Sequence, residues 1–349
     1  MRNQYLIAEH PFAQYVRILG KGKTSSRSLS LDEARDAMAM IIAGEVEPVQ
    51  IGAFLMLLRV KEESPEELAG FVMAAKTAIA HQRDSDLNAA GLPALKADLD
   101  WSSYAGKRKH YPWFLLAVKL LCQRGVRIFM HGASGHTSNR LYTEAVLPSV
   151  GLPVCASWAE AQMAIGETNF AYLPLSVLTP VLDDMISLRG LLGLRSPVHT
   201  LTRLLNPTDA PAVMQAIFHP AYRESHQRAA LLLGYANSCV IKGDGGEIER
   251  NPDGSCLAKR VVNGEPVDED WPMIFTQRHA PEESFDDQLL MRVWRGEQAH
   301  EYGEMAVIGT LALTLRTLGL SPNPEAAMLM AERLWQQRLD ASAPPLMRA

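Results

Sequence analysis

The sequence predicts a small all-helical part at the N-terminus followed by a larger α/β part. Residues 1–83 carry apolar side chains at helical spacing, with capping residues at the segment ends. From Ala94 onward, short apolar runs alternate with helical segments of ten or more residues, which is typical of a sheet covered by helices. The 349 residues allow either two domains or one large α/β unit, because a single core rarely exceeds about 250 to 300 residues.

Three helices are expected in the N-terminal part. Ser30 is the N-cap of the first, Glu33 completes a capping box with it, and Gly44 stands where the helix should end. Pro48 begins the second helix, whose apolar residues fall on one face. Ser64 caps the third helix, with a proline at the first helical position.

The α/β part begins with a segment that contains two turns, residues 102–140. It reads as a basic turn, a buried helix, an apolar strand and a second turn rich in glycine and serine. Further along we expect a strand at 170–173, a helix at 180–192, a helix soon after residue 211, a second helix near 226–233, a strand at 238–241, short strands over 257–280, and C-terminal helices that include 303–318.

The composition, 47% hydrophobic and 21% charged, is that of an ordinary globular protein. No run approaches the roughly 18 apolar residues of a membrane span, and the N-terminal segment lacks the apolar core of a signal peptide. We therefore expect a cytoplasmic protein without membrane contact. The four cysteines form no CxxC pair, which favours buried thiols over a zinc site or a disulfide framework. The net charge of −5 argues weakly against nucleic acid as a partner, yet it is compatible with a local basic cleft.

The two turns of segment 102–140 are expected at one edge of the sheet, where ligands of α/β proteins collect. The first turn combines four basic side chains with three aromatic ones: Lys107, Arg108, Lys109 and His110 with Tyr104, Tyr111 and Trp113. Basic side chains attract phosphates and aromatic faces stack on bases. A solvated helix start is the competing interpretation of the basic residues, and core packing is the favoured one for Tyr111 and Trp113.

The run LSLDEARDAMAMIIAGEVEPVQIGAFLMLLRVKEESPEELAGFVMA resembles the helical domain of anthranilate phosphoribosyltransferase and, more loosely, that of pyrimidine nucleoside phosphorylases. Three later segments, MHGASGHTSNR, SLRGLLGLRSPVHTLTRLLNP and GDGGEIE, resemble the family's KHGN loop, its R-x-x-LG-x-RT…NP segment and its acidic loop. The resemblance implies a helical domain over 1–93 and an α/β domain with a central mixed sheet over 94–349. A segment near 150–200 is expected to return to the helical domain. It also implies a cleft between the domains and a homodimer.

The family's diphosphate loop is altered in this sequence. The resemblance implies that phosphoribosyl pyrophosphate is held by a GTGGD loop, and DWSSYAGKRKHYPW stands in its place. Only Gly106 remains as a loop glycine. The bulk of Trp101 and Tyr104 and the missing amide hydrogen of Pro112 disfavour a close approach of a diphosphate to the backbone.

The other donor-side loops are altered as well. The lysine and asparagine of KHGN are replaced by Met130 and Ala133, and the aspartate of the acidic loop by Gly246. Glu247 remains as a weak candidate for a magnesium ligand, although solvated loop carboxylates describe Glu247 and Glu249 equally well. We expect no cofactor, and Mg²⁺ only if the protein is an active transferase.

The acceptor side is better preserved. By the resemblance, Arg189, Arg195 and Asn206 are implied to line it. The expected phosphate and nucleic-acid site comprises the basic turn and the loop that faces it: Lys107, Arg108, Lys109, His110, His131, Gly132 and Arg140, with His136, His199 and Arg203 as further contributors.

Two functions follow from these residues. The favoured hypothesis is a homodimeric binding protein that holds DNA or RNA in a basic groove without catalysis, because the basic turn resembles that of the family's nucleic-acid-binding, YbiB-like paralogues. The alternative is a divergent phosphoribosyltransferase that acts on an aromatic or heteroaromatic acceptor such as anthranilate. Such a transfer demands a firmly held diphosphate and its metal. The loop that would hold the diphosphate and the acidic loop that would hold the metal are both altered in this sequence.

Overall fold

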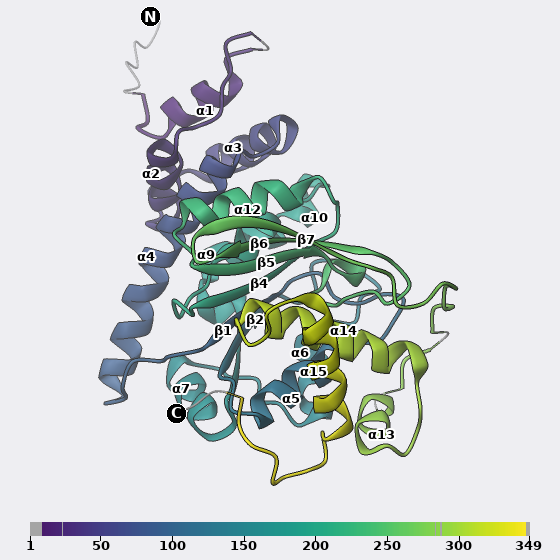
Figure 1. Cartoon of the computed structure of the whole chain (residues 1–349). Helices are drawn as coiled ribbons and strands as arrows, with labels where there is room; N and C mark the ends of the chain where they lie inside the picture. Colours follow the sequence, from purple (N-terminus) through teal and green to yellow (C-terminus); the bar gives the residue numbers. More distant parts are fainter. Residues whose placement is uncertain (1–8, 23, 283, 287, 347–349) are drawn as a thin grey trace, which may run out of the picture.

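The computed structural model describes residues 9–22, 24–282, 284–286 and 288–346. A helical part, α1 to α4, stands beside an α/β part built on one seven-stranded sheet (Figure 1). This arrangement confirms the predicted fold class: a small helical domain joined to a larger α/β domain with a central mixed sheet.

The helical part forms where the capping signals predict it. Ser30 Oγ accepts a hydrogen bond from the amide of Glu33, and Ser64 Oγ accepts one from the amide of Glu67, so both expected capping boxes are present. Gly44 follows the first predicted helix with a φ of 73°, a conformation that glycine adopts without strain. The four helices are α1 (Ala13–Gly20), α2 (Leu31–Ile42), α3 (Pro48–Lys61) and α4 (Pro65–Ala89).

The sheet has the order β3-β2-β1-β4-β5-β6-β7. The first five strands in this order are parallel, and β6 and β7 run antiparallel to their neighbours. The carboxyl ends of the five parallel strands therefore lie at one edge of the sheet. The strands are β1 (Leu99–Ser103), β2 (Ile128–Gly132), β3 (Phe170–Pro174), β4 (Ala212–Ile217), β5 (Asn237–Lys242), β6 (Cys256–Val262) and β7 (Glu265–Trp271).

Helices and short turns connect the strands and cover the sheet. They are α5 (Phe114–Gln123), α6 (Thr143–Val146), η1 (Leu147–Val150), α7 (Trp158–Thr168), α8 (Leu175–Leu178), α9 (Pro180–Ser187), α10 (Arg189–Leu192), α11 (Val198–Leu201), η2 (Thr202–Leu204), α12 (Tyr222–Leu232), η3 (Asp244–Gly246), α13 (Leu289–Arg295), α14 (Glu301–Thr317) and α15 (Pro324–Gln336). The helix expected at 180–192 is thus two helices, α9 and α10, separated by Leu188.

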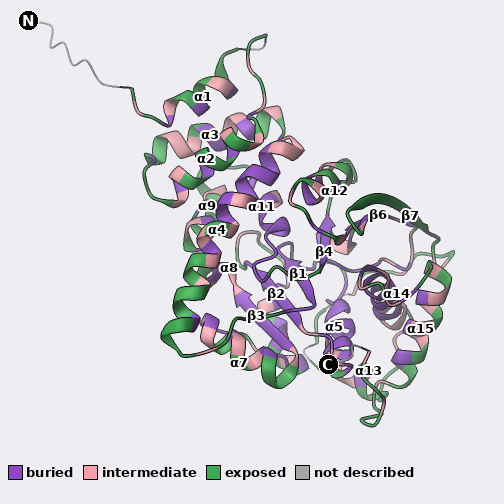
Figure 2. Cartoon of the chain, turned by 60° about the vertical axis from the view of Figure 1, so that its left-hand side comes forward, coloured by how far each residue is buried: buried purple, intermediate pink, exposed green. Residues whose placement is uncertain are grey.

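The central strands are buried on both faces. Every residue of β1, β2 and β4 is buried (Figure 2). Parallel strands covered by helices on both sides read as continuous apolar runs rather than as alternating patterns. This explains one wrong expectation: the helix predicted soon after residue 211 is the central strand β4. The run AVMQAI is too short for its periodicity to separate helix from strand, and its alanines and methionine favour helix locally.

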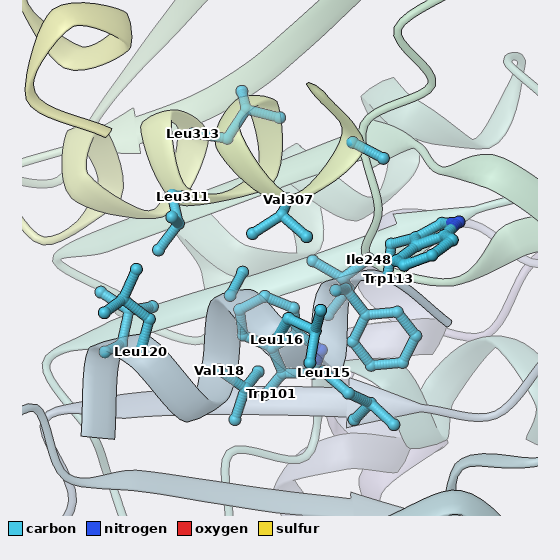
Figure 3. Close-up of a cluster of buried hydrophobic side chains, with 14 of the residues drawn as sticks. Trp101, Trp113, Leu115, Leu116, Val118, Leu120, Ile248, Val307, Leu311 and Leu313 are labelled. Atoms are coloured by element: carbon cyan, nitrogen blue, oxygen red, sulfur yellow. The ribbon is translucent and has the colours of Figure 1, made fainter. Parts of the chain in front are cut away.

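One apolar core lies between the sheet and the C-terminal helices. Val307 and Leu311 of α14 point toward Leu116 of α5 and Trp101 of β1 (Figure 3). Trp101 is fully buried in this core and stacks on Phe114 with ring centroids 6.0 Å apart. It therefore belongs to the sheet, which corrects the expectation that its bulk obstructs the diphosphate loop.

A second apolar cluster joins the helical part to the opposite face of the sheet. It includes Phe54 of α3 and Phe71 of α4 together with Trp158 of α7, Leu182 of α9 and Phe129 of β2. The segment around α7 to α11 thus shares its core with the N-terminal helices. Because the cluster spans the expected boundary at residues 93 and 94, the exact division into domains stays a prediction.

The outer strand β7 is acidic. Its sequence EPVDEDW places Glu265, Asp268 and Asp270 on an exposed edge, and Pro266 there lacks an amide hydrogen. The four cysteines, by contrast, are buried and free, as predicted. Among the described helices, none combines the length and apolar character that a bilayer crossing requires.

Glycine substitutions test the packing of the helical part. A Cβ on Gly70 of α4 would lie 2.3 Å from the carbonyl oxygen of Leu31 and 2.8 Å from Ala34 Cβ in α2, whereas a Cβ on Gly52 of α3 would meet nothing within 4 Å. We expect Gly70→Ala to lower the free energy of unfolding by about 1 to 3 kcal/mol. Gly52→Ala should raise it by up to about 1 kcal/mol. Urea denaturation measures both, and equal midpoints would contradict the close approach of α2 and α4.

Candidate functional site

The site is built from loops at the carboxyl edge of the parallel strands. The loop after β1 and the loop after β2 are joined by a pair of backbone hydrogen bonds of 2.8 Å between Lys107 and Leu141. Arg140 Nη1 donates to the carbonyl oxygen of Gly106 at 2.9 Å and to that of Gly245, in the loop after β5, at 3.2 Å. Three loops that are distant in sequence are thereby fixed together.

The amides of the loop after β1 already hold an anion of the protein itself. Glu247 Oε1 accepts hydrogen bonds of 2.6 Å from the amides of both Ala105 and Gly106, and its Oε2 accepts one of 2.7 Å from Ser103 Oγ. Glu247 is 1% exposed. Charge-assisted hydrogen bonds of this kind are among the stronger ones in proteins. The backbone donors of this loop are therefore engaged by an internal carboxylate.

Lys107 lies inside the protein rather than in an exposed basic cluster. It is 1% exposed, and its ammonium contacts Asp244 and, at 2.5 Å, Glu249 Oε1. Burial alone would raise the pKa of the Asp244 carboxyl, but the Lys107 ammonium lowers it overall. For Glu249 burial prevails and raises the pKa to about 7, against the opposing effect of Lys107. Its Oε2 also accepts the amide of Phe114 at 2.9 Å.

These contacts do not fit a magnesium site. Both oxygens of Glu247 accept hydrogen bonds from the protein, and an ammonium group stands between Asp244 and Glu249. No group of three or more metal-ligating side chains with suitable geometry occurs among the described residues. Glu247 is thus misplaced for the ligand role that the sequence suggested, since Mg²⁺ needs carboxylate oxygens that are free to coordinate it.

The basic turn is divided in two. Arg108 and Lys109 are exposed, as expected of a phosphate-binding surface. Lys107 is buried as described, and His110 is 6% exposed, has its Nδ1 2.8 Å from Glu282 Oε2 and stacks on Tyr302 with ring centroids 4.2 Å apart. The aromatic neighbours Tyr104, Tyr111 and Trp113 are also buried. The favoured interpretation of Tyr111 and Trp113, core packing, is therefore confirmed, and none of the three rings offers an open face to a base.

His131 and Gly132 are buried within the sheet and contact its neighbouring strand. His131 is fully buried between Tyr104 Oη, 2.7 Å from its Nδ1, and Asp100, 3.4 Å from its Nε2. A Cβ on Gly132 would lie 2.1 Å from the carbonyl oxygen of Ser103, so β1 and β2 pack closely only with glycine there. Neither residue is placed to bind a phosphate, which corrects the expectation from the sequence.

Two of the three acceptor-side residues come together. Arg189 Nη1 donates to the carbonyl oxygen of His136 at 2.6 Å and to Thr137 Oγ1, and Arg195 donates to the same Thr137 oxygen at 3.3 Å. Asn206 lies apart from them, because its side chain forms two hydrogen bonds with the backbone of Ala210. Its role is to hold a turn with a φ of 40°.

A cavity of about 390 Å³ lies between the helical part and the sheet edge. Arg59 reaches it from the last turn of α3, Glu63 from the segment between α3 and α4, and Tyr222 from the start of α12. The cationic and imidazole side chains in its wall are Arg59, Arg195, Arg203, His136, His199, His219 and His226. Its size is that of a small-molecule site.

Three arginines outnumber the two glutamates in the wall of this cavity. Burial lowers the pKa of the Arg195 guanidinium, and repulsion by Arg189 and Arg140 lowers it further. Burial also lowers the pKa of the Arg203 guanidinium, although Glu247 opposes the shift. Positive charges that repel one another favour the binding of an anion between them. A bound anion would raise the pKa of each guanidinium group back toward its usual range.

Three histidines of the cavity are neutral at pH 7. Burial is the main cause in each case, and it lowers the pKa of His136 to about 4 and the pKa values of His199 and His226 to about 3. Arg195 and Arg203 lower the first two further by repulsion. The arginines therefore carry the positive charge of the cavity.

Several cavity residues escape detection from the sequence. Arg59 lies on a helix far along the chain from the loops, and no local pattern connects the two. Phe218 and His219 directly follow β4, so a correct assignment of that strand would have placed them at the sheet edge. His226 was expected only as part of a helix, and its burial beneath the cavity depends on how α12 packs.

Comparison with known proteins finds similar sequences in one group of proteins. Residues 14–78 match the family model described as the helical bundle domain of the glycosyl transferase family. The chain is 27% identical over 243 residues to YbiB of Escherichia coli, covering 69% of this chain and 73% of that protein. It is 28% identical over 233 residues to anthranilate phosphoribosyltransferase of Oleidesulfovibrio alaskensis, covering 67% and 68%.

The chain is therefore similar to the anthranilate phosphoribosyltransferase-like family in its helical bundle, in its sequence and in its fold.

Solved structures of the anthranilate phosphoribosyltransferase-like family share the fold. The enzyme from Thermus thermophilus superimposes with a TM-score of 0.73 at 22% identity, over 95% of both chains. The enzyme from Saccharomyces cerevisiae, solved in complex with PRPP and Mg, gives a TM-score of 0.70 at 14% identity, over 96% of both chains. The family scaffold is thus retained over nearly the whole chain.

The buried lysine can be tested by its effect on stability. Lys107→Met keeps the aliphatic length but leaves Asp244 and Glu249 without their counter-charge. We expect the free energy of unfolding to fall by about 3 to 5 kcal/mol, as for other broken buried ion pairs. The matched control Lys109→Met alters an exposed neighbour and should stay within about 0.5 kcal/mol. Chemical denaturation compares the two, and equal losses would place Lys107 outside the interior.

The cavity histidines predict a loss of stability in acid. Below pH 6.5 an unfolded chain protonates its histidines, while His136, His199 and His226 stay neutral in the folded protein until about pH 4 or 3. Each should therefore lower the free energy of unfolding by about 1.4 kcal/mol per pH unit between pH 6 and pH 4. Urea denaturation across this range should show a shallower dependence for His226→Gln. The exposed His81→Gln control should follow the unaltered protein.

Proposed function

We propose that this protein binds nucleic acid at the basic loop edge and does not catalyse phosphoribosyl transfer. The observation that carries the proposal is a set of cations without counter-ions. Six basic side chains at this edge form no ion pair with a described carboxylate: Arg108, Lys109, Arg140, Arg189, Arg195 and Arg203.

The charge of the loop edge and one exposed aromatic ring support a polyanion with bases, a nucleic acid, as the ligand. Elsewhere, many basic side chains are neutralised by a carboxylate in an ion pair. The six cations at the loop edge have no such partner among the described carboxylates, although the net charge of the protein is −5. A local basic surface of this kind attracts a phosphate backbone despite the overall charge. Phe218, which is 48% exposed at the cavity, offers a base the aromatic face that Tyr104, Tyr111 and Trp113 do not.

The groups that would bind the diphosphate donor of a transferase reaction are engaged in contacts within the protein. The loop amides hold Glu247, and Lys107 stands between two carboxylates of the acidic loop. Diphosphate and Mg²⁺ would each have to displace a buried ionic contact. Release of a buried charge from its partner costs several kcal/mol, so catalysis by the usual family arrangement is disfavoured.

Oligonucleotide binding tests the proposal. Fluorescence anisotropy should show an affinity that falls steeply as salt rises, because binding releases counter-ions from phosphates. We expect Arg108→Ala/Lys109→Ala to weaken binding and to flatten the slope of log affinity against log salt by about 0.7 for each phosphate that the variant no longer binds. Lys107 is left unaltered, because its replacement would destabilise the fold.

The control for this experiment is Arg295→Ala. Arg295 is exposed, lies on α13 and pairs with Glu297 at 2.6 Å. Its replacement by alanine therefore removes a positive charge from a segment that is remote in sequence from the basic loops. Its binding should equal that of the unaltered protein. The proposal fails if both variants bind alike. Light scattering of the same samples tests the proposed homodimer.

A divergent phosphoribosyltransferase is the second candidate, favoured by the retained pair Arg189 and Arg195 and by the similarity to the family. It requires magnesium-dependent consumption of phosphoribosyl pyrophosphate in the presence of an acceptor such as anthranilate. We expect none. Turnover in that assay, or growth of a tryptophan auxotroph that lacks its own transferase, would replace the binding proposal.

A further inference from the structure

The inner wall of the cavity carries polar atoms that lack partners. Ser196 Oγ, His199 Nε2 and His226 Nε2 have no hydrogen-bond partner within the described part of the chain. Their residues line the cavity and are only 6%, 9% and 1% exposed. An unpaired buried polar atom costs free energy, and native proteins keep few of them. Three around one cavity indicate a polar ligand.

The two histidines present acceptors to that ligand. His226 Nδ1 lies 2.8 Å from Gln215 Oε1, and His199 Nδ1 lies 3.3 Å from the carbonyl oxygen of Ser196. Both oxygens accept hydrogen bonds, so each Nδ1 carries the proton of the neutral ring. Each Nε2 is then a buried acceptor without a partner among the described residues, in a side chain that lines the cavity. A ligand that satisfies these atoms brings a proton with it.

The arginines require the same ligand to be an anion. Arg203 Nη1 donates to the carbonyl oxygens of Ala216 and Gly246, and its Nε donates to that of His199. Its Nη2 forms no hydrogen bond with the described residues. Arg195 forms a single bond of 3.3 Å with Thr137. Guanidinium groups with unused donors beside a cavity favour phosphate oxygens.

A phosphomonoester meets both requirements. Its ionised oxygens suit Arg195 and Arg203, and because its second ionisation lies near pH 6, the monoanion that keeps one proton for an imidazole is readily reached near neutral pH. A phosphodiester carries a single charge and no ionisable hydroxyl, so it satisfies the wall less well. Glu62 and Glu63 also line the cavity, and burial raises the pKa of the Glu63 carboxyl, which favours the form that can donate a hydrogen bond to a phosphate.

We propose that the cavity receives the terminal phosphomonoester of a nucleic-acid strand, so that the protein prefers strand ends that carry a phosphate. This inference rests on the proposed nucleic-acid binding and narrows it. Internal phosphodiesters contact the exposed part of the basic edge, at Arg108 and Lys109. The end of the strand enters the cavity past Phe218 and Tyr222, both of which line it.

Three single strands of one sequence test the preference: one with a 5′-phosphate, one with a 3′-phosphate and one with hydroxyls at both ends. Competition against an internally labelled strand should show at least one phosphate-ended form binding about tenfold or more tightly than the hydroxyl-ended form, the effect of charged hydrogen bonds. The better of the two phosphate-ended strands identifies which end is recognised.

Variants in the wall separate the cavity from the general basic edge. Arg195→Met should abolish the preference for a phosphate end, whereas hydroxyl-ended strands should lose only the affinity that one of the six uncompensated charges supplies. Ser196→Ala should reduce the preference without lowering stability, because Ser196 Oγ has no partner in the described residues. Arg108→Ala/Lys109→Ala should instead weaken all three strands by the same factor and keep the preference.

The outcomes distinguish this inference from the function on which it rests. Equal affinity for all three strands overturns the end preference but leaves nucleic-acid binding in place. A preference that persists in Arg195→Met and Ser196→Ala also overturns it, since the phosphate would then lie elsewhere. Failure of every strand to bind at low salt overturns both proposals together.

Discussion

The candidate site depends on ionic contacts that are satisfied within the protein. The Lys107 ammonium is buried against Asp244 and Glu249, and the Glu247 carboxylate fills the amides at Ala105 and Gly106. Together these contacts tie the loop after β1 to the loop after β5. Buried charges are stable only when paired and hydrogen-bonded, so the position of each loop depends on the other.

This internal pairing changes what the family scaffold can bind. In the yeast enzyme solved with PRPP and Mg, an external anion and cation are present. In this chain, the Glu247 carboxylate accepts the amides of Ala105 and Gly106, and the Lys107 ammonium contacts Asp244 and Glu249. Uncompensated charge is left on the arginines at the rim and in the cavity, where the pKa values of Arg195 and Arg203 are lowered. These arginines, rather than the loop after β1, are therefore the groups on which the proposed binding rests.

Local signals in the sequence predict part of this structure well. Ser30 and Ser64 mark the helix starts because a cap depends on residues three positions away. β4 was mistaken for a helix because burial on both faces comes from the rest of the fold. The direction of the Lys107 side chain could not be predicted, since its partners lie 137 and 142 residues further along the chain. Arg59 was missed for the same reason, whereas Arg195 was found through its family motif.

The acidic outer strand β7 limits how copies of this chain can associate. A sheet edge ordinarily invites another strand to pair with it. Here Glu265, Asp268 and Asp270 would bring the acidic strand of one copy beside the acidic strand of another, and Pro266 cannot donate to a ladder. Sheets of neighbouring molecules are therefore kept from fusing along this edge. A symmetric assembly that used this edge would set two acidic strands against each other at close range, an arrangement that like-charge repulsion opposes.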